Sequence, residues 1–355
     1  MWPGRPPERD FMGKPRFHIV SSPLTAAGSF ADLDPALFPG LEGHPLYGGF
    51  TRRLYRTIYP ASHLDRSFVV ADESGPVAAV PCTVQDGEIS MLGLPIPIAF
   101  RRDVDSAAAA KATTAALEHL DAIGAADGAA VARLRGGEGA NLGPIDNACI
   151  ARLAKPETKM YAVVDLAGGE DAIRRGVRDS YRSLVNWGRK QMAMIYVNRD
   201  QPDRSRFEAY PAFHTRIAGR GARDAAYWET VWAEIAAGGA ELSLGHLADG
   251  TLIAGTLTTY AGTGAGGQAY YASGTYDRER FDKPIAHWPV FDAMVRAAAR
   301  GIARYDLGEV FPRGAADDKE VQIGFFKKGF TDTIVLRLEW RVPLVPPRAD
   351  APTAG

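Results

Sequence analysis

The stretch "EVQIGFFKKGF", residues 320–330, sets two lysines among aromatic side chains near the end of the chain. On an α-helix, where successive residues turn by about 100°, Val321 and Phe325 share one side. Ile323 and Phe326 share the opposite side. We therefore expect a helix that is buried on two sides, with at least one lysine close to the protein interior.

The two lysines of this stretch, Lys327 and Lys328, allow two interpretations. Lysines in the last turn complement the helix dipole; Gly329 would then cap the helix while the lysine stems lie along apolar surface. Alternatively, a cation held where water is excluded stabilises negative charge that develops during a reaction. A desolvated ammonium costs free energy unless a partner compensates, so the second arrangement would have to serve a function.

Length, composition and charge predict a globular protein of two domains. The chain has 355 residues, of which 46% are hydrophobic and 23% charged, and its formal net charge is −1. A nearly neutral chain has no overall field that attracts nucleic acid or an anionic membrane, so a polyanionic partner would have to be bound locally.

Cysteine usage and the apolar segments indicate the cellular compartment of the protein. Cys82 and Cys149 are the only cysteines and have no metal-like spacing, so we expect a reducing compartment and no bound metal. The beginning of the sequence lacks the apolar core of a signal peptide, and the most apolar later run, residues 91–100, contains two prolines. We expect a cytoplasmic protein with no membrane span.

Hydrophobic periodicity predicts alternating strands and helices along the whole chain. In the N-terminal half, we expect strands at residues 16–22, 67–72, 76–84 and 129–135, and helices at residues 47–59 and 106–124. In the C-terminal half, we expect strands at residues 160–166, 192–198, 303–308 and 333–341, three strands within residues 240–276, and helices at residues 170–191, 204–218, 224–238, 284–301 and 320–330.

This pattern predicts an α+β fold of two units in tandem, each a mixed, mostly antiparallel sheet flanked by helices. We place the N-terminal domain at residues 16–156 and the C-terminal domain at residues 157–345, so that they meet near Pro156. Residues 1–15 and 346–355 are rich in proline and are expected to be loose termini.

A spacing typical of coenzyme A binding occurs in "RIAGRG", residues 216–221. Arg216, Gly219 and Gly221 fit the pattern R-x-x-G-x-G that acetyltransferases use to hold a pyrophosphate. That loop normally joins a strand to a helix, whereas the residues before it recur here at helical spacing, so we expect it to join two helices. Because helix N-termini bind phosphate in general, the coenzyme A interpretation stays open.

Four segments of the C-terminal half resemble the Fem family of nonribosomal peptidyltransferases, which are built from tandem GNAT-like domains. They are "DSYRSLVNWGRK" (residues 179–190), "AYYASG" (269–274), "HWPVFDAMVRAAARGIARYDLGE" (287–309) and "FFKKGF" (325–330), which is similar to the family's Phe-Lys-x-Gly-Phe. The N-terminal half resembles the family in outline only. The resemblance implies a donor amino acid carried as an ester on tRNA, an acceptor amine on a peptidoglycan precursor or a small molecule, and no bound cofactor.

The resemblance points to Lys327 as the catalytic cation, with Phe326 as an apolar wall beside it. Aminolysis of an ester passes through a tetrahedral oxyanion, which a fixed ammonium stabilises best where water is excluded. Ser180 and Arg182 match a hydroxyl and arginine pair that members of the family are thought to use for substrate contacts. Asn186 replaces a tyrosine of the family, which counts against a muramyl-nucleotide acceptor. We expect all three to bind substrate, with a solvated basic face as the alternative.

Two tyrosines and two carboxylates complete the candidate residues. Tyr270 and Tyr271 are neighbours on a predicted strand, so their side chains point to opposite faces and we expect one of them, Tyr271, to line the substrate cleft. Asp306 and Glu309 lie at the end of another predicted strand, where they would position an acceptor amine or take its proton, or else serve as turn residues. The histidines show no metal-ligand spacing, and we expect His287 to be structural.

Three functions fit these observations. The first is an aminoacyl-tRNA-dependent transferase that forms an amide by direct transfer, since no motif indicates a covalent intermediate. The second is an acyl-CoA-dependent N-acyltransferase of the GNAT superfamily. The third is a non-catalytic tandem GNAT module that binds a glycan or peptide precursor, which a solvent-exposed Lys327 with no pocket beside it would favour.

Overall fold

The computed structural model describes residues 17–24, 30, 33–34, 37–58, 63–139, 142–218, 223–262 and 266–345. They divide into two compact units. The N-terminal unit contains the described residues up to 42, from 63 to 159 and from 336 onward, and the C-terminal unit contains residues 43–58 and 160–335. Both units combine helices with mostly antiparallel strands, so the predicted α+β class is confirmed.

The compact units differ from the predicted domains in two segments. Residues 43–58 precede most of the N-terminal unit in sequence but pack in the C-terminal unit, and residues 336–345 return to the N-terminal unit. The expected boundary at Pro156 lies within β9 (Lys155–Asp165), the strand in which the chain passes from one unit to the other. The predicted loose termini lie outside the described residues.

The N-terminal unit contains two sheets and two main helices. Its elements are β1 (His18–Ser21), α1 (Pro39–Glu42), β2 (Leu64–Asp65), β3 (Phe68–Asp72), β4 (Gly75–Val80), β5 (Thr83–Gln85), β6 (Glu88–Ser90), β7 (Ala99–Phe100), α3 (Ser106–Asp127), β8 (Val131–Glu138), α4 (Pro144–Ala151) and most of β15 (Ile334–Pro343). The strand orders within this unit are β1-β3-β4-β7 and β15-β8-β6-β5-β2. Among these neighbours, β6 and β8 run parallel.

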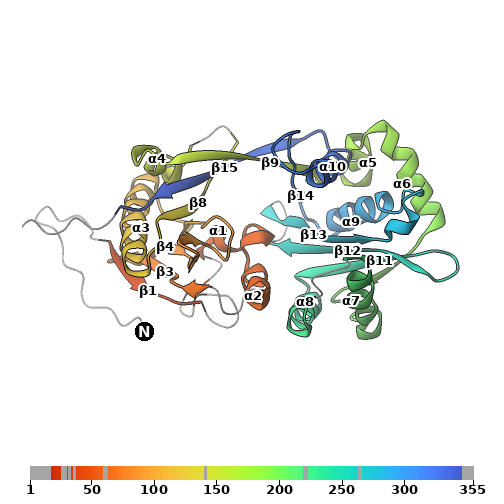
Figure 1. Ribbon diagram of the computed structural model, residues 1–355, viewed down its shortest axis with the longest axis horizontal. Helices are drawn as coiled ribbons and strands as arrows, with labels where there is room; N and C mark the ends of the chain where they lie inside the picture. Colours follow the sequence, from red (N-terminus) through yellow and green to blue (C-terminus); the bar gives the residue numbers. More distant parts are fainter. Residues whose placement is uncertain are drawn as a thin grey trace, which may run out of the picture. The chain divides into compact units, whose positions relative to one another are not determined.

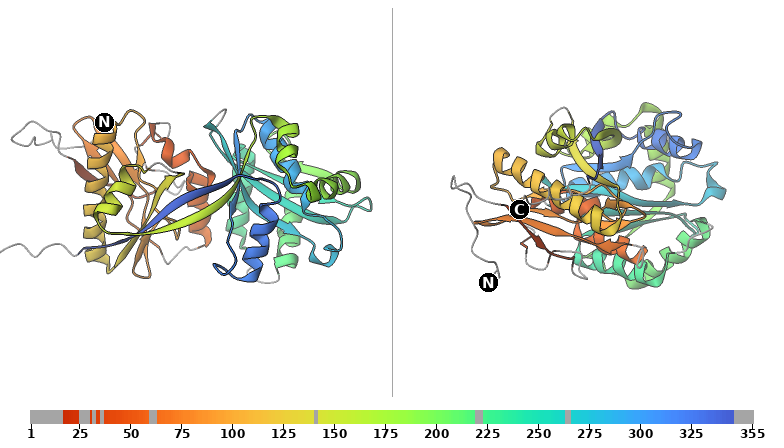
Figure 2. Two further views of the ribbon diagram at one scale, coloured as in Figure 1. Left: turned by 90° about the horizontal axis from the view of Figure 1, so that it is seen from above. Right: turned by 60° about the vertical axis from the view of Figure 1, so that its left-hand side comes forward.

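Helix α3 shows how local signals set the ends of an element. Asp105 accepts a hydrogen bond from the N–H of Ala108 at 2.7 Å and so caps the N-terminus. Gly128 takes the left-handed conformation, with φ of 74°, at the C-terminus. Between these ends, Leu117 and Leu120 are buried in the core of the unit. Helix α4 packs beside α3 (Figure 2).

Six strands of the C-terminal unit are consecutive neighbours in one sheet, and helices cover both faces there. Its elements are η2 (Pro45–Tyr47), α2 (Gly49–Ile58), most of β9, α5 (Gly169–Gly176), α6 (Asp179–Gln191), β10 (Ala193–Val197), α7 (Arg204–Ala218), α8 (Ala225–Ala237), β11 (Ala240–His246), β12 (Leu252–Ala261), β13 (Gln268–Tyr276), η4 (Arg278–Arg280), α9 (His287–Ala299), β14 (Arg304–Glu309) and α10 (Asp318–Lys327). The strand order is β10-β11-β12-β13-β14-β9, and only β13 and β14 run parallel among these neighbours. Helices α5, α6 and α9 lie on one face, and α7 and α8 on the other (Figure 1).

The helix predicted at residues 170–191 is interrupted. Val177 and Arg178 have extended ψ angles of 133° and 137°, which separate α5 from α6. The backbone N–H of Arg178 donates to the carbonyl of Gly329 at 2.9 Å, so the interruption ties this helix pair to the lysine segment. The hydrophobic period continues across the break, which is why the sequence predicted one helix.

Helix α10 carries the lysine segment, and two expectations about it were wrong. Phe330 is buried and Phe326 half-buried, but Ile323, which shares the side of Phe326, and Phe325 on the opposite side are exposed, so the helix is not buried on two sides. Gly329 does not take a left-handed conformation, and Lys328 is the capping residue. A Cβ on Gly329 would lie 1.9 Å from a ring carbon of Tyr181. The glycine is therefore needed for close packing rather than for helix termination.

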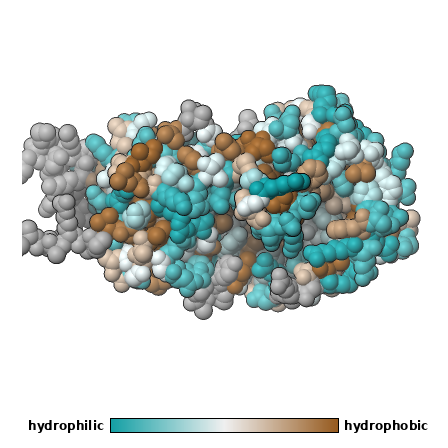
Figure 3. All heavy atoms as spheres, turned by 45° about the horizontal axis from the view of Figure 1, so that its top comes forward, coloured by the Kyte–Doolittle hydropathy of each residue, from teal (hydrophilic) through white to brown (hydrophobic). Residues whose placement is uncertain are grey.

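Hydrophobic residues reach the surface in separate patches among hydrophilic ones on the face seen in Figure 3. In the C-terminal unit, Phe281 and Phe325 are 58% and 56% exposed. No helix in the described part of the chain combines the length and the apolar composition that crossing a membrane requires.

Candidate active site

The strands β13 and β14 separate after a short parallel pairing. They pair over three residues each, and the pairing ends at Tyr270 and Asp306. Beyond these residues, β13 runs on to Tyr276 beside β12, and β14 runs on to Glu309 beside β9. Both strands have a register shift against their other neighbour at this point, which bends them apart. The C-terminal unit therefore has an opening in its sheet.

Lys327 reaches this opening from the end of α10. Its Nζ donates to the backbone carbonyl of Glu309 at 3.0 Å. It would also lie 3.0 Å from a Cβ placed on Gly308, whose φ of +91° suits only glycine. Burial lowers the pKa of Lys327, while the charges of Asp306 and Glu309 act in the opposite direction. Lys328 is exposed, so the structure distinguishes the two lysines.

Asp306 is buried and is joined to a histidine from the beginning of the chain. His44 and Asp306 have side chains that are 3% and 2% exposed, and the His44 Nε2 lies 3.0 Å from the Asp306 Oδ2. The N–H of Leu46 donates to the His44 Nδ1 at 3.2 Å, so in the neutral ring Nε2 carries the proton and donates to Asp306. The other carboxylate oxygen, Oδ1, accepts from the N–H of Gly308 at 2.7 Å.

These contacts form a chain that ends at the ammonium group. His44 is hydrogen-bonded to Asp306, and Asp306 accepts a hydrogen bond from the N–H of Gly308. The carbonyl of the next residue, Glu309, accepts a hydrogen bond from Lys327. Asp306 and Glu309 are therefore placed to orient Lys327, one through its side chain and the other through its backbone. We call His44, Asp306, Gly308 and Glu309 the lysine-positioning chain.

A cavity of about 660 Å³ lies against Lys327. Its walls come mainly from β13, the segment around η4, and α10. Among the described residues that line it, Arg278, Lys319 and Lys327 are cations and none is a carboxylate. Such a cavity favours an anionic ligand or a reaction in which negative charge develops.

Both candidate tyrosines border this cavity, although one alone was expected to do so. The Tyr270 hydroxyl would lie 3.5 Å from a Cβ on Gly308, which puts it on the side of Lys327. The Tyr271 hydroxyl is 2.9 Å from that of Tyr276, and burial raises the pKa of Tyr271 well above its ordinary value. Tyr270 is therefore the tyrosine that lies near the ammonium group.

Phe326 lies in the wall of the cavity and belongs to an aromatic cluster. Its ring centroid is 5.3 Å from that of His287, 5.1 Å from that of Phe330 and 6.1 Å from that of Tyr181. The contacts with His287 and Phe330 are edge-to-face, and such contacts contribute about 0.5–1.5 kcal/mol each. Burial lowers the pKa of His287, so its ring is neutral at neutral pH.

The residues taken from the family motif in α6 do not reach this site. Ser180 is exposed. Arg182 donates to the carbonyls of Val177 and Arg175 at 3.2 and 2.9 Å, and Asn186 accepts a hydrogen bond from Arg174. None of the three lines the cavity beside Lys327. Their role in substrate binding stays a prediction.

Sequence reasoning missed His44 and Gly308, and of the two neighbouring tyrosines it preferred Tyr271 to Tyr270. His44 lies 262 residues before Asp306, so no local spacing connects the two. A signal did exist for Gly308, since a glycine directly between strand residues often marks a bulge.

The segment with coenzyme A-like spacing lies between two helices, as predicted. Arg216 is in the last turn of α7, and α8 is the next helix. Gly219 and Gly221 lie outside the described residues. The Arg216 side chain is 3.7 Å from the buried carboxylate of Asp277.

No protein-family model matches the sequence, and a comparison with curated proteins gives no match. The fold is similar to several solved structures. FemX shares 14% identity at a TM-score of 0.60, with 80% of this chain and 90% of FemX covered. L-PGS from Bacillus licheniformis shares 13% identity at 0.53, with 78% and 83% covered. A tandem GNAT protein from the clavulanic acid biosynthesis pathway shares 13% identity at 0.53, with 94% and 100% covered. The chain therefore has a Fem-like tandem GNAT fold, as the sequence resemblance implied.

Proposed function

We propose that this protein transfers an aminoacyl group from the 3′ ester of a tRNA to an amine acceptor and so forms an amide. The observation that carries the proposal is the half-buried ammonium group of Lys327, held at the sheet opening beside a cavity without carboxylates among its described lining residues. Its lowered pKa reflects a site from which water is partly excluded. The fold shared with FemX and L-PGS supports the same reaction class.

The reaction needs no covalent intermediate. The acceptor nitrogen attacks the ester carbonyl carbon, a C–N bond forms, and the carbonyl oxygen becomes an oxyanion beside Lys327. Collapse of this intermediate breaks the C–O bond to the ribose, and the proton lost by the amine ends on the ribose hydroxyl. Lys327 contributes because its attraction to the oxyanion exists in the transition state and not in the neutral ester.

Asp306 has a positioning role in this mechanism. Both of its oxygens already accept hydrogen bonds, from His44 and from the N–H of Gly308. It is also absent from the lining of the described cavity, so we assign proton removal from the amine to another group. Asp306 and the rest of the lysine-positioning chain keep Lys327 in the orientation that the transition state requires.

The carrier of the donor group is bound by local cations. Arg278 and Lys319 are exposed residues that line the same cavity as Lys327. Cations of this kind bind phosphate groups, and the 3′ end of a tRNA and coenzyme A both contain phosphates. The acceptor is an amine of a peptidoglycan precursor or of a small molecule, on the analogy of the Fem-like fold.

One experiment separates the two carriers. The protein is incubated with total charged tRNA or with a set of acyl-CoA thioesters, together with candidate amines, and amide products are followed by mass spectrometry. With tRNA as carrier, product formation disappears after ribonuclease treatment and falls steeply as salt is raised, because phosphate contacts release counterions. The absence of product from charged tRNA with every amine would refute the proposal.

Acyl-CoA-dependent N-acylation is the second candidate. One observation favours it: the similar tandem GNAT protein from the clavulanic acid biosynthesis pathway, described in its form without acetyl-CoA, is covered over 100% of its length. Product formation from acyl-CoA that is insensitive to ribonuclease would support this reaction and exclude the first.

A further inference from the structure

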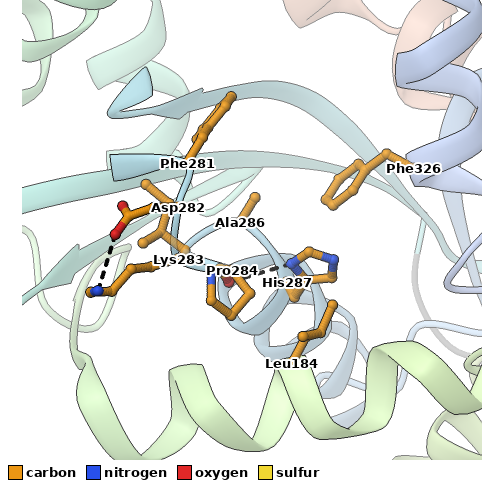
Figure 4. A pocket seen from close by; sticks show the side chains of 9 residues that line it. Leu184, Phe281, Asp282, Lys283, Pro284, Ala286, His287 and Phe326 are labelled. Carbon is orange, nitrogen blue, oxygen red and sulfur yellow. Dashed lines mark hydrogen bonds and ion pairs between the residues drawn. The ribbon is translucent and has the colours of Figure 1, made fainter. Parts of the chain in front are cut away.

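A second cavity, of about 420 Å³, adjoins the one beside Lys327. The two share Phe281, Ala286 and Phe326. In Figure 4, Phe281 and Phe326 project on either side of Ala286, and Leu184 of α6 lies beside His287 of α9. Because Phe326 directly precedes Lys327 in α10, a ligand that reaches the ammonium group can extend past Phe326 into this second space.

The interior of the second cavity is apolar and uncharged. Its only charged lining residues in the described chain, Asp282 and Lys283, are exposed and pair with each other at 3.1 Å. His287 is neutral because burial lowers its pKa, and its Nδ1 lies 3.3 Å from the carbonyl of Pro284. The other lining residues are apolar: Leu184, Phe281, Pro284, Ile285, Ala286 and Phe326.

We infer that this second cavity holds the side chain of the transferred acyl group, and that this side chain is apolar and uncharged, as in leucine or phenylalanine. The inference rests on the proposed function. When the ester carbonyl of the donor lies at Lys327, the side chain on the donor's α-carbon faces the residues that the two cavities share. We call the second space the side-chain cavity.

Size and charge both define the donor class. A larger apolar side chain covers more of these apolar walls and so displaces more water from them, and each methylene changes the selectivity of such a site by roughly 10-fold or more. A lysyl side chain would place an ammonium group among apolar walls, where Asp282 is already paired with Lys283. An alanyl side chain is too short to contact most of these apolar walls.

Binding of stable donor analogues tests the inference without depending on turnover. The probes are 3′-aminoacylamino-3′-deoxyadenosines with leucyl, phenylalanyl, alanyl and lysyl groups, and the CoA thioesters of 4-methylpentanoate and acetate. Affinities for the full-length protein are measured by calorimetry. Whichever carrier binds, we expect the leucyl-like and phenylalanyl members to bind at least about 100-fold more tightly than the alanyl or acetyl member. The lysyl member should bind most weakly.

Variants locate the preference in the side-chain cavity. Leu184→Trp fills the space, so the leucyl-to-alanyl affinity ratio should fall to near one while the alanyl probe still binds. Phe281→Ala removes a wall and should lower the ratio as well, which keeps a test available if Leu184→Trp does not fold. Phe325→Ala is the matched control: this phenylalanine is equally exposed but lines neither cavity, so the ratio should not change.

The outcomes separate this inference from the proposed function. Equal affinity for all side chains, a preference for the lysyl probe, or an unchanged ratio in Leu184→Trp and Phe281→Ala would overturn the side-chain assignment alone. A loss of preference in Phe325→Ala as large as in Phe281→Ala would overturn it too. If no probe of either carrier binds, the assignment and the proposed function both fail.

Discussion

Replacing Lys327 with methionine is the sharpest test of the proposed chemistry. Methionine keeps most of the length and volume of the lysine stem and removes the ammonium group. The substitution deletes the hydrogen bond to the Glu309 carbonyl, which costs about 1 kcal/mol of stability. Because Lys327 is only half-buried and its burial is already unfavourable for the charge, we expect the variant to fold.

The expected loss of activity follows from the surroundings of the ammonium group. Two unit charges about 4 Å apart attract by roughly 4 kcal/mol near a protein surface and by about 1 kcal/mol in water. Lys327 lies between these limits, so the oxyanion should lose about 3 kcal/mol of stabilisation, which corresponds to roughly a hundredfold in turnover. The Michaelis constants should change little, because the neutral ester does not need the charge.

The assay is the initial rate of amide formation with varied donor and acceptor, after circular dichroism has established folding. Lys328→Met is the control, since Lys328 is the exposed neighbour at the C-cap of the same helix. It should keep nearly full activity. Equal losses in the two variants, or normal turnover by Lys327→Met, would refute the catalytic role and leave the lysines as helix-terminating residues.

Three further predictions concern the same region. Activity should fall as the pH rises through the pKa of Lys327, which lies below the ordinary lysine value of 10.5 because burial disfavours the charge; a rate that is flat to pH 11 would contradict this. His44→Ala should lower kcat by roughly 10- to 100-fold at constant KM, because Lys327 loses its positioning, and His44→Gln should recover part of this loss. Steady-state kinetics measures both constants, and a change in KM in place of kcat would contradict the positioning role. Gly329→Ala should lower the free energy of unfolding by about 1–3 kcal/mol in urea titrations, because its Cβ would overlap the Tyr181 ring, whereas Gly176→Ala, whose Cβ meets no atom within 4 Å, should not.

Most helices and strands were predictable because their signals are local. The apolar positions of α3, α7, α8 and α9 recur at helical spacing. The three strands β11, β12 and β13 lie within residues 240–276, where the sequence predicted three strands. The preference for Lys327 over Lys328 also came from the sequence, through the family motif. Helix ends and buried faces were less predictable: α10 is exposed at Phe325 and Ile323, although its pattern indicated two buried sides.

The arrangement around the ammonium group depends on contacts between distant parts of the chain. The bond between His44 and Asp306 joins residues 262 positions apart, and the two cavities combine residues from α6, β13, α9 and α10. Hydrophobic periodicity reports which face of an element is buried, but it carries no information about which element covers that face. The sequence therefore contained the catalytic lysine candidate and the fold class, while the partners of Lys327 arose only when folding brought β14, the residues before η2 and α10 together.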